Sequence, residues 1–121
     1  MTSVLNVDTI AAKDGTSPVE LTKQNTIKVF YDSKTTFGTA DNSFGVSSSS
    51  DAGAGQTAIN FTNAFDSAFY VAAGMSFDAD GVLFSNQSDK LASSCEIRNF
   101  GIGSSSNVDA DIEVMITGDL A

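Results

Sequence analysis

The sequence predicts an all-β protein, an antiparallel β-sandwich of jelly-roll-like type with an extended N-terminal arm. Apolar residues recur at every second position in short runs, whereas the spacing of an amphipathic helix is nearly absent. Roughly seven or eight such runs follow one another, a number typical of sandwiches and barrels. Segments rich in Gly, Ser and Asp separate the runs, and the length of 121 residues suits a single domain.

Residues 1–25 are predicted to form the arm, and residues 26–121 the sandwich body. The stretch VLNVDTIAAKDGTSPVELTKQ holds two short apolar runs on either side of a glycine turn, and Pro18 limits sheet pairing in the second run. Polar residues interrupt the first run, so the stretch lacks the continuous apolar core of a secretory signal. We expect the arm to dock on a partner's sheet edge. The alternative is that Val4–Ile10 is the first strand of the same sandwich.

The distribution of charge supports the same division. The net charge is −9, yet the first 35 residues carry four basic and four acidic side chains, and the rest carries two basic and eleven acidic ones. This asymmetry suggests two parts with different surroundings, or simply a solvated acidic body. Because phosphates require a basic face, nucleic acid is not an expected partner. No apolar run approaches the roughly 20 residues that span a bilayer, so we expect a soluble chain without membrane insertion.

Strands are expected in the body wherever apolar residues alternate. The segments, in chain order, are TIKVFYD (26–32), a run at Val46, QTAINFT (56–62), AFYVAAGMSF (68–77), GVLFS (81–85), SCEIRNF (94–100) and NVDADIEVMIT (107–117). In the first segment Phe30 lies opposite Val29 and Tyr31, so both faces of that strand are expected to be covered. In the last, one face is apolar, as a half-buried strand requires: Val108, Ala110, Ile112, Val114 and Ile116.

Turn residues separate these strands. SSSSDAGAGQ is predicted to be a hairpin connection, with Gly53 and Gly55 available for positive φ. Asp80-Gly81 is a favoured two-residue hairpin turn between two apolar runs. NFGIGSSSN is a further glycine-rich loop, and TNAFDSA is long enough for only one helical turn.

The core is expected to be built largely from phenylalanine, of which the chain has nine, with no Trp. Residues expected inside include Ile112, Val114, Ile116 and Cys95, with Ile97 and Phe100 beside the cysteine on one strand face. The aromatic residues expected inside are Phe61, Phe65, Phe69, Tyr70 and Phe84. Phe37 and Phe44 are expected in the core too, with packing between subunits as the alternative.

The sequence offers little chemistry for catalysis. It has no histidine, which excludes Ser-His-Asp and Cys-His catalysis in their usual forms and His-based metal sites. Its single cysteine, Cys95, cannot form an intrachain disulfide and is expected to be a buried structural thiol. No phosphate-binding glycine motif precedes a helix. No catalytic, cofactor-binding or metal-binding residue is therefore predicted.

The acidic face of the last strand is the one cluster open to more than one interpretation. Asp109, Asp111 and Glu113 alternate, which places adjacent carboxylates about 7 Å apart on one strand face. A solvated surface is the simplest interpretation. The alternatives are a divalent-cation site where symmetry-related copies meet and a glycosidase-type carboxylate pair.

Three segments and the final strand together resemble a known class of protein. The segments are SVLNVDTI, DGTSPVELTKQ and DNSFGVSSSSDAGAGQTAINFTNAFDSAFY, and the alternating acidic strand ends in glycine, Asp109–Gly118. Over nearly the whole chain this pattern resembles small virion proteins of tailed bacteriophages, and is especially similar to tail-fibre-type proteins of marine phages. The resemblance implies a β-rich, homotrimeric subunit fixed to the virion through its N-terminal arm.

The function that we expect is therefore that of a non-enzymatic virion structural protein, a short tail fibre or a capsid-surface fibre or decoration subunit. It would assemble in the host cytoplasm, need no cofactor, and contact copies of itself and another virion protein. One alternative is a host-surface module that binds glycan or protein through the loops SSSSDAGAG and GSSS. The other is a carboxylate-based enzyme.

Overall fold

A computed structural model describes residues 27–34, 36–77 and 80–119 of the chain. Within these residues ten strands form two sheets, and every pairing between strands is antiparallel. This confirms the predicted all-β sandwich. The predicted arm, residues 1–25, lies outside the described residues. No helix in the described ranges is long and apolar enough to cross a membrane.

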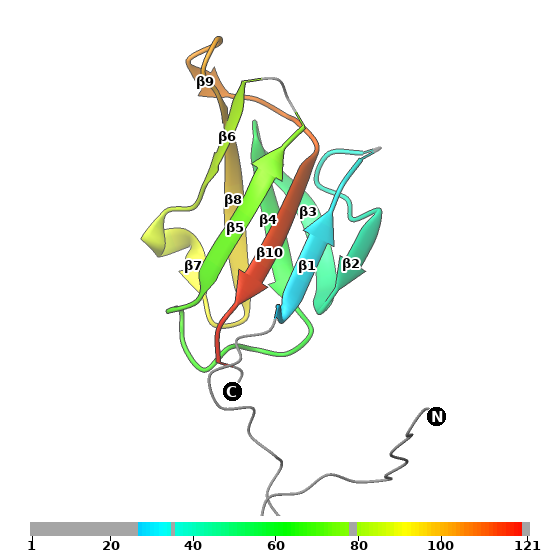
Figure 1. Cartoon of the computed structure of the whole chain (residues 1–121), viewed down its shortest axis with the longest axis vertical. Helices are drawn as coiled ribbons and strands as arrows, with labels where there is room; N and C mark the ends of the chain where they lie inside the picture. The colour runs from blue at the N-terminus through cyan, green and yellow to red at the C-terminus, as the bar shows by residue number, and fades with distance from the viewer. Residues whose placement is uncertain (1–26, 35, 78–79, 120–121) are drawn as a thin grey trace, which may run out of the picture.

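The first sheet has four strands in the order β2-β1-β10-β5. They are β2 (Asn42–Phe44), β1 (Val29–Asp32), β10 (Ile112–Thr117) and β5 (Val71–Ser76). Figure 1 shows this sheet in front, with the second sheet behind it. The central strands β1 and β10 come from the beginning and the end of the body, so the first sheet pairs residues that lie far apart in the sequence.

The second sheet has four strands in the order β3-β4-β8-β6, with two short strands also paired to β8. They are β3 (Val46–Gly53), β4 (Gln56–Phe61), β8 (Ser94–Gly101), β6 (Gly81–Phe84), β7 (Lys90–Leu91) and β9 (Ser106–Asn107). A single 3₁₀ turn, η1 (Gln87–Asp89), precedes β7. The predicted β3–β4 hairpin is confirmed, and Gly53 and Gly55 have φ of 136° and 64° as its turn requires.

The chain passes repeatedly between the sheets, which makes the sandwich jelly-roll-like. Strands β1, β10 and β5 lie side by side in one sheet, and β4, β8 and β6 lie side by side in the other. The connections β2–β3, β4–β5, β5–β6 and β9–β10 each carry the chain from one sheet to the facing one. The core lies between the two sheets.

Inward residues follow the predicted period of two. Ile112, Val114 and Ile116 are buried on β10, as are Ile59 and Phe61 on β4. An aromatic cluster closes the end of the sandwich where β4 ends: the Phe61 and Phe65 rings are 5.1 Å apart and meet edge to face, and the Tyr70 ring stacks at 4.7 Å on Phe65. The predictions for these core residues are confirmed.

Three of the predicted core phenylalanines are instead exposed. Phe69 is 85% exposed because it precedes the inward-facing Tyr70, and neighbouring residues of an extended chain point to opposite sides. Phe84 is 39% exposed because Leu83 takes the inward position on β6. Phe44 is 65% exposed on the outer side of β2.

Two further strand predictions are wrong in detail. On β8 the inward residues are Cys95, Ile97 and Asn99, so strict alternation buries Asn99 where Phe100 was expected. Asn99 satisfies one donor by donating from Nδ2 to the Val108 carbonyl at 3.0 Å. The last strand begins only at Ile112, and the preceding Val108 and Ala110 are half-buried outside it.

The predicted hairpin turn at Asp80-Gly81 is also wrong. The strands on either side of it, β5 and β6, belong to different sheets, so the segment between them is a crossover. Residues 78 and 79 lie outside the described residues. The Asp-Gly pair indicates only a local change of chain direction. The pairing partners of the two strands lie elsewhere in the sequence: β5 pairs with β10, and β6 pairs with β8.

Candidate assembly interface

The outer side of the first sheet carries a row of apolar side chains that crosses all four strands. Phe30 on β1 is aligned with Phe44 on β2 and with Met115 on β10, which is aligned in turn with Ala73 on β5. Phe44 and Met115 are 65% and 46% exposed, and Ala73 is exposed as well. We call the surface formed by Phe44, Phe30, Met115 and Ala73, together with Val71 and Met75 of β5, the apolar face.

The apolar face is hollowed near the β10–β5 boundary. A groove of about 330 Å³ lies there, lined by Phe30, Ala73, Gly74, Met75, Glu113 and Met115. Met75 and Val71 are 58% and 63% exposed on its β5 side. Contiguous exposed apolar surface of this kind marks sites of interaction with other macromolecules. Because of this groove the apolar face is not flat, and a partner of complementary shape can insert a side chain into it.

Charged groups lie along one side of the apolar face, where one lysine pairs with two carboxylates. Lys34 Nζ lies 3.1 Å from Asp32 Oδ2 and 3.5 Å from Glu113 Oε1, and 5.7 Å from the centre of the Phe77 ring. The hydrogen bond to the Asp32 carboxylate raises the pKa of Lys34. A polar border around an apolar centre is the ordinary anatomy of a protein–protein interface.

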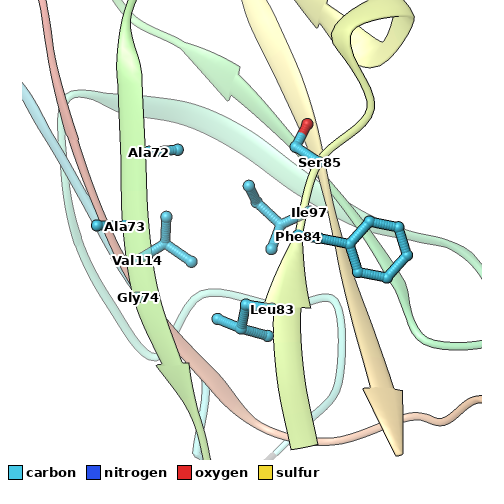
Figure 2. Close-up of a pocket in the computed structure, with 8 residues that line it drawn as sticks. All are labelled: Ala72, Ala73, Gly74, Leu83, Phe84, Ser85, Ile97 and Val114. Carbon is cyan, nitrogen blue, oxygen red and sulfur yellow. The ribbon is translucent and has the colours of Figure 1, made fainter.

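A second opening, which we call the cleft, lies between the edge strands β5 and β6. It has a volume of about 230 Å³ and is lined by Ala72, Ala73, Gly74, Leu83, Phe84, Ser85, Ile97 and Val114. In Figure 2, Leu83 and Ala72 point into the space between the two strands, while the Phe84 ring points away from it. Ile97 and Val114, which belong to the core, form its floor.

The structure separates the three carboxylates that the sequence placed on one strand face. Asp109 lies before β10 and accepts a hydrogen bond of 2.6 Å from the Gly55 N–H. Asp111 precedes β10, and its carbonyl accepts the Phe77 N–H at 2.9 Å. Glu113 alone lies on β10, where it pairs with Lys34. Within the described ranges, no three His, Cys, Asp or Glu side chains gather as they would around a metal ion.

Cys95 is buried, as predicted, in a closed part of the core. Burial raises the pKa of its thiol to about 12. The neighbouring Tyr70 hydroxyl donates hydrogen bonds toward the Ser94 and Leu91 carbonyls at 2.9 and 3.1 Å, and burial raises its pKa too. Lys90 Nζ lies 4.5 Å from the centre of the Tyr70 ring. Burial therefore keeps the Cys95 thiol and the Tyr70 hydroxyl in their neutral forms.

Sequence reasoning identified the apolar face only in part. Phe30 was expected to be covered on the second side of its strand, and packing between subunits was the alternative for Phe44. Met115 and Ala73 were missed. The signal for Met115 was available, because it breaks the series of polar residues that alternates along Asn107–Glu113.

Comparison with protein families, with curated proteins and with solved structures gives no match to this chain. The functional argument therefore depends on the surfaces described above.

Proposed function

We propose that the chain is a non-enzymatic structural subunit of a bacteriophage virion, a homotrimeric tail-fibre or capsid-surface (fibre or decoration) protein anchored through its N-terminal arm. The apolar face carries this proposal. Phe44, Phe30, Met115 and Ala73 form one continuous row across the sheet, and their exposure to water is unfavourable unless another surface covers them. The resemblance of the sequence to tail-fibre-type proteins supplies the virion context.

Self-association through the apolar face must overcome the charge of the chain. A trimer carries −27, three times the charge of one copy, and this repulsion acts against assembly. The centre of the apolar face carries no charge, and Lys34 offsets one of the two carboxylate charges beside it. Burying one large apolar side chain contributes about 1.5–3 kcal/mol, so a few from each copy can exceed the screened repulsion.

The proposal is tested with a matched pair of surface substitutions. Met115 and Val82 are 46% and 47% exposed on the outer sides of different sheets. Met115→Lys and Val82→Lys change the net charge equally. We expect Met115→Lys to weaken association by about tenfold or more, since a lost side-chain burial of about 1.5 kcal/mol corresponds to that factor. Val82→Lys should associate like the wild type.

Light scattering and sedimentation equilibrium measure this association. The wild-type chain should have the mass of three copies, and its association should strengthen as salt rises from about 0.1 M to 1 M, where the screening length falls from about 10 Å to about 3 Å. A monomer at every salt concentration would contradict the proposal. Equal weakening by both substitutions would exclude the apolar face as the interface.

A second candidate function is a host-surface binding module, and one observation favours it. The two loops expected to bind glycan or protein meet at one end of the sandwich. The Gly55 N–H of the β3–β4 turn donates to Asp109 in the β9–β10 connection, and the Gly103 N–H of the β8–β9 turn donates to Asp80 Oδ2 of the β5–β6 crossover at 2.5 Å. Figure 1 places this end opposite the one where β10 ends. Binding to a glycan array that is lost on replacing Ser104 and Ser105 by bulky residues would support this function.

A further inference from the structure

The β5–β6 side of the sandwich is open along two edge strands. β5 ends the first sheet and β6 ends the second, and neither pairs on its outer edge with another described strand. Exposed edges are usually protected by Lys, Pro, a bulge or a covering segment. β5 reads VAAGMS and β6 reads GVLF, with no charge and no proline. β6 is also protected by its length of only four residues, which leaves the six-residue β5 as the edge that a covering segment would protect.

The backbone of β5 is oriented to receive such a segment. The Phe77 N–H donates to the Asp111 carbonyl of the neighbouring chain segment at 2.9 Å. In an antiparallel pair, hydrogen-bonding groups alternate between the two sides of a strand. Counting back along β5, the N–H and C=O groups of Ala72 and Gly74 are directed away from β10, toward the open edge. A strand added there can pair with both residues.

The cleft beside this edge has room for the side chains of an added strand. The inward residues of β5 at this level are Ala72 and Gly74, the smallest available, opposite Leu83 of β6. Gly74 cannot be enlarged, because a Cβ there would lie 2.1 Å from the Glu113 carbonyl oxygen. The space of about 230 Å³ above Ile97 and Val114 is therefore built into the fold. Its lining is uncharged and mostly apolar, with Ser85 as its one polar side chain, so it suits aliphatic side chains.

We propose that the cleft receives the N-terminal segment of a neighbouring copy of this chain, which adds Leu5–Thr9 as a strand along β5. In this run Leu5 and Val7 alternate with Asn6 and Asp8, so an added strand can insert the two aliphatic side chains and leave the polar ones in solvent. This inference rests on the proposed self-assembly and names the receiving site of the arm.

The length of chain before β1 is sufficient for the run to reach a neighbouring copy. Residues 10–26 separate the donated run from Ile27, and 17 residues can span up to about 56 Å. Within one copy β1 lies two strands from β5, a distance of only about 10 Å, so a tether of this length is not needed to reach the chain's own β5. An arm that enters the next copy makes a heterologous contact, and three such contacts close a ring.

Disulfide trapping between full-length chains tests this assignment. One chain carries Val7→Cys, and a second, distinguished by an affinity tag, carries Ala72→Cys or Leu83→Cys on either wall of the cleft. The two are co-expressed and exposed to a mild oxidant. The native Cys95 is 2% exposed and stays out of the exchange. We expect a mixed dimer on non-reducing gels, because a disulfide forms only where Cβ atoms lie close together.

The matched control is Asn6→Cys, one residue away on the opposite face of the same run. It should give several-fold less mixed dimer than Val7→Cys with the same cleft partner. Equal yields from the two, no mixed dimer, or a disulfide formed only within one chain carrying both substitutions would each overturn the inference. If the wild-type chain is trimeric and no mixed dimer forms, this inference fails and the proposed function stands. A wild-type chain that is monomeric contradicts the proposed function itself.

Discussion

The outer surfaces of the two sheets are built by the same alternation of side chains and yet differ in character. On the first sheet the outward row is Phe44, Phe30, Met115 and Ala73. On the second sheet the outward residues of β3, β4 and β8 are mostly polar, such as Ser48 aligned with Asn60, whereas β6 exposes the apolar Val82 and Phe84. A sheet face that stays in water is normally polar. The outer side of the first sheet is therefore more continuously apolar than that of the second, which is the basis of the proposed interface.

The second sheet also carries the charges that the apolar face lacks. Arg98 on β8 lies 2.9 Å from Asp89 and 3.0 Å from Glu96, and all three side chains are partly exposed. Asn60 Nδ2 donates to Ser48 Oγ at 3.0 Å across β4 and β3. These contacts keep the outer residues of the second sheet paired among themselves. The comparison of the two outer faces shows that alternation along a strand determines which residues point outward. The types of those residues then determine whether the face is apolar or polar.

The largest expected effect contrasts the two sides of one strand. Val114 is 1% exposed on the inner side of β10, next to Met115 on the outer side. Val114→Asp places an unpaired carboxylate in the core, which costs several kcal/mol and should abolish soluble expression. Met115→Lys should leave expression and the melting temperature near those of the wild type. A soluble Val114→Asp variant that melts cooperatively would contradict the assignment of β10 as a central strand.

Deleting residues 1–25 separates assembly from folding. The core of the described body is formed by residues from Val29 to Ile116, so the shortened chain should melt close to the wild-type temperature, as followed by circular dichroism. It should nevertheless fail to enter particles, since the arm is absent while the apolar face is intact. Collapse of the shortened chain would instead make Val4–Ile10 the first strand of the sandwich, and the docking of the arm would be excluded.

The smallest expected effect concerns the second sheet. Arg98→Gln removes a partly exposed cation from Asp89 and Glu96, and such pairs contribute about 1 kcal/mol or less. Denaturant unfolding should show a loss of stability of that order, and light scattering should show an unchanged oligomer mass. A change of oligomer mass on this side of the molecule would remove the distinction between the two faces.

Alternation along the sequence determined more of the core than of the candidate interface. Ile112, Val114 and Ile116 could be placed inside because burial on a strand follows from its own residues and their period of two. The same rule misplaced Phe84 and Phe100. On β6 and β8 either of two alternating sets of residues could have faced inward, and the preceding Leu83 and Asn99 took the inward positions. Phe30 could be recognised as lying on a second apolar side, but nothing local linked it to Phe44, Met115 or Ala73.

The sequence by itself determined that the body is all-β, where most of its longer strands lie, and that Cys95 is buried. Only the tertiary structure decided which strands pair, because hydrogen bonding between strands joins residues as distant as Val29 and Ile116 and leaves no local trace. That pairing turned the predicted Asp80-Gly81 hairpin into a crossover, aligned four scattered apolar residues into one face, and set the edges of β5 and β6 side by side around the cleft.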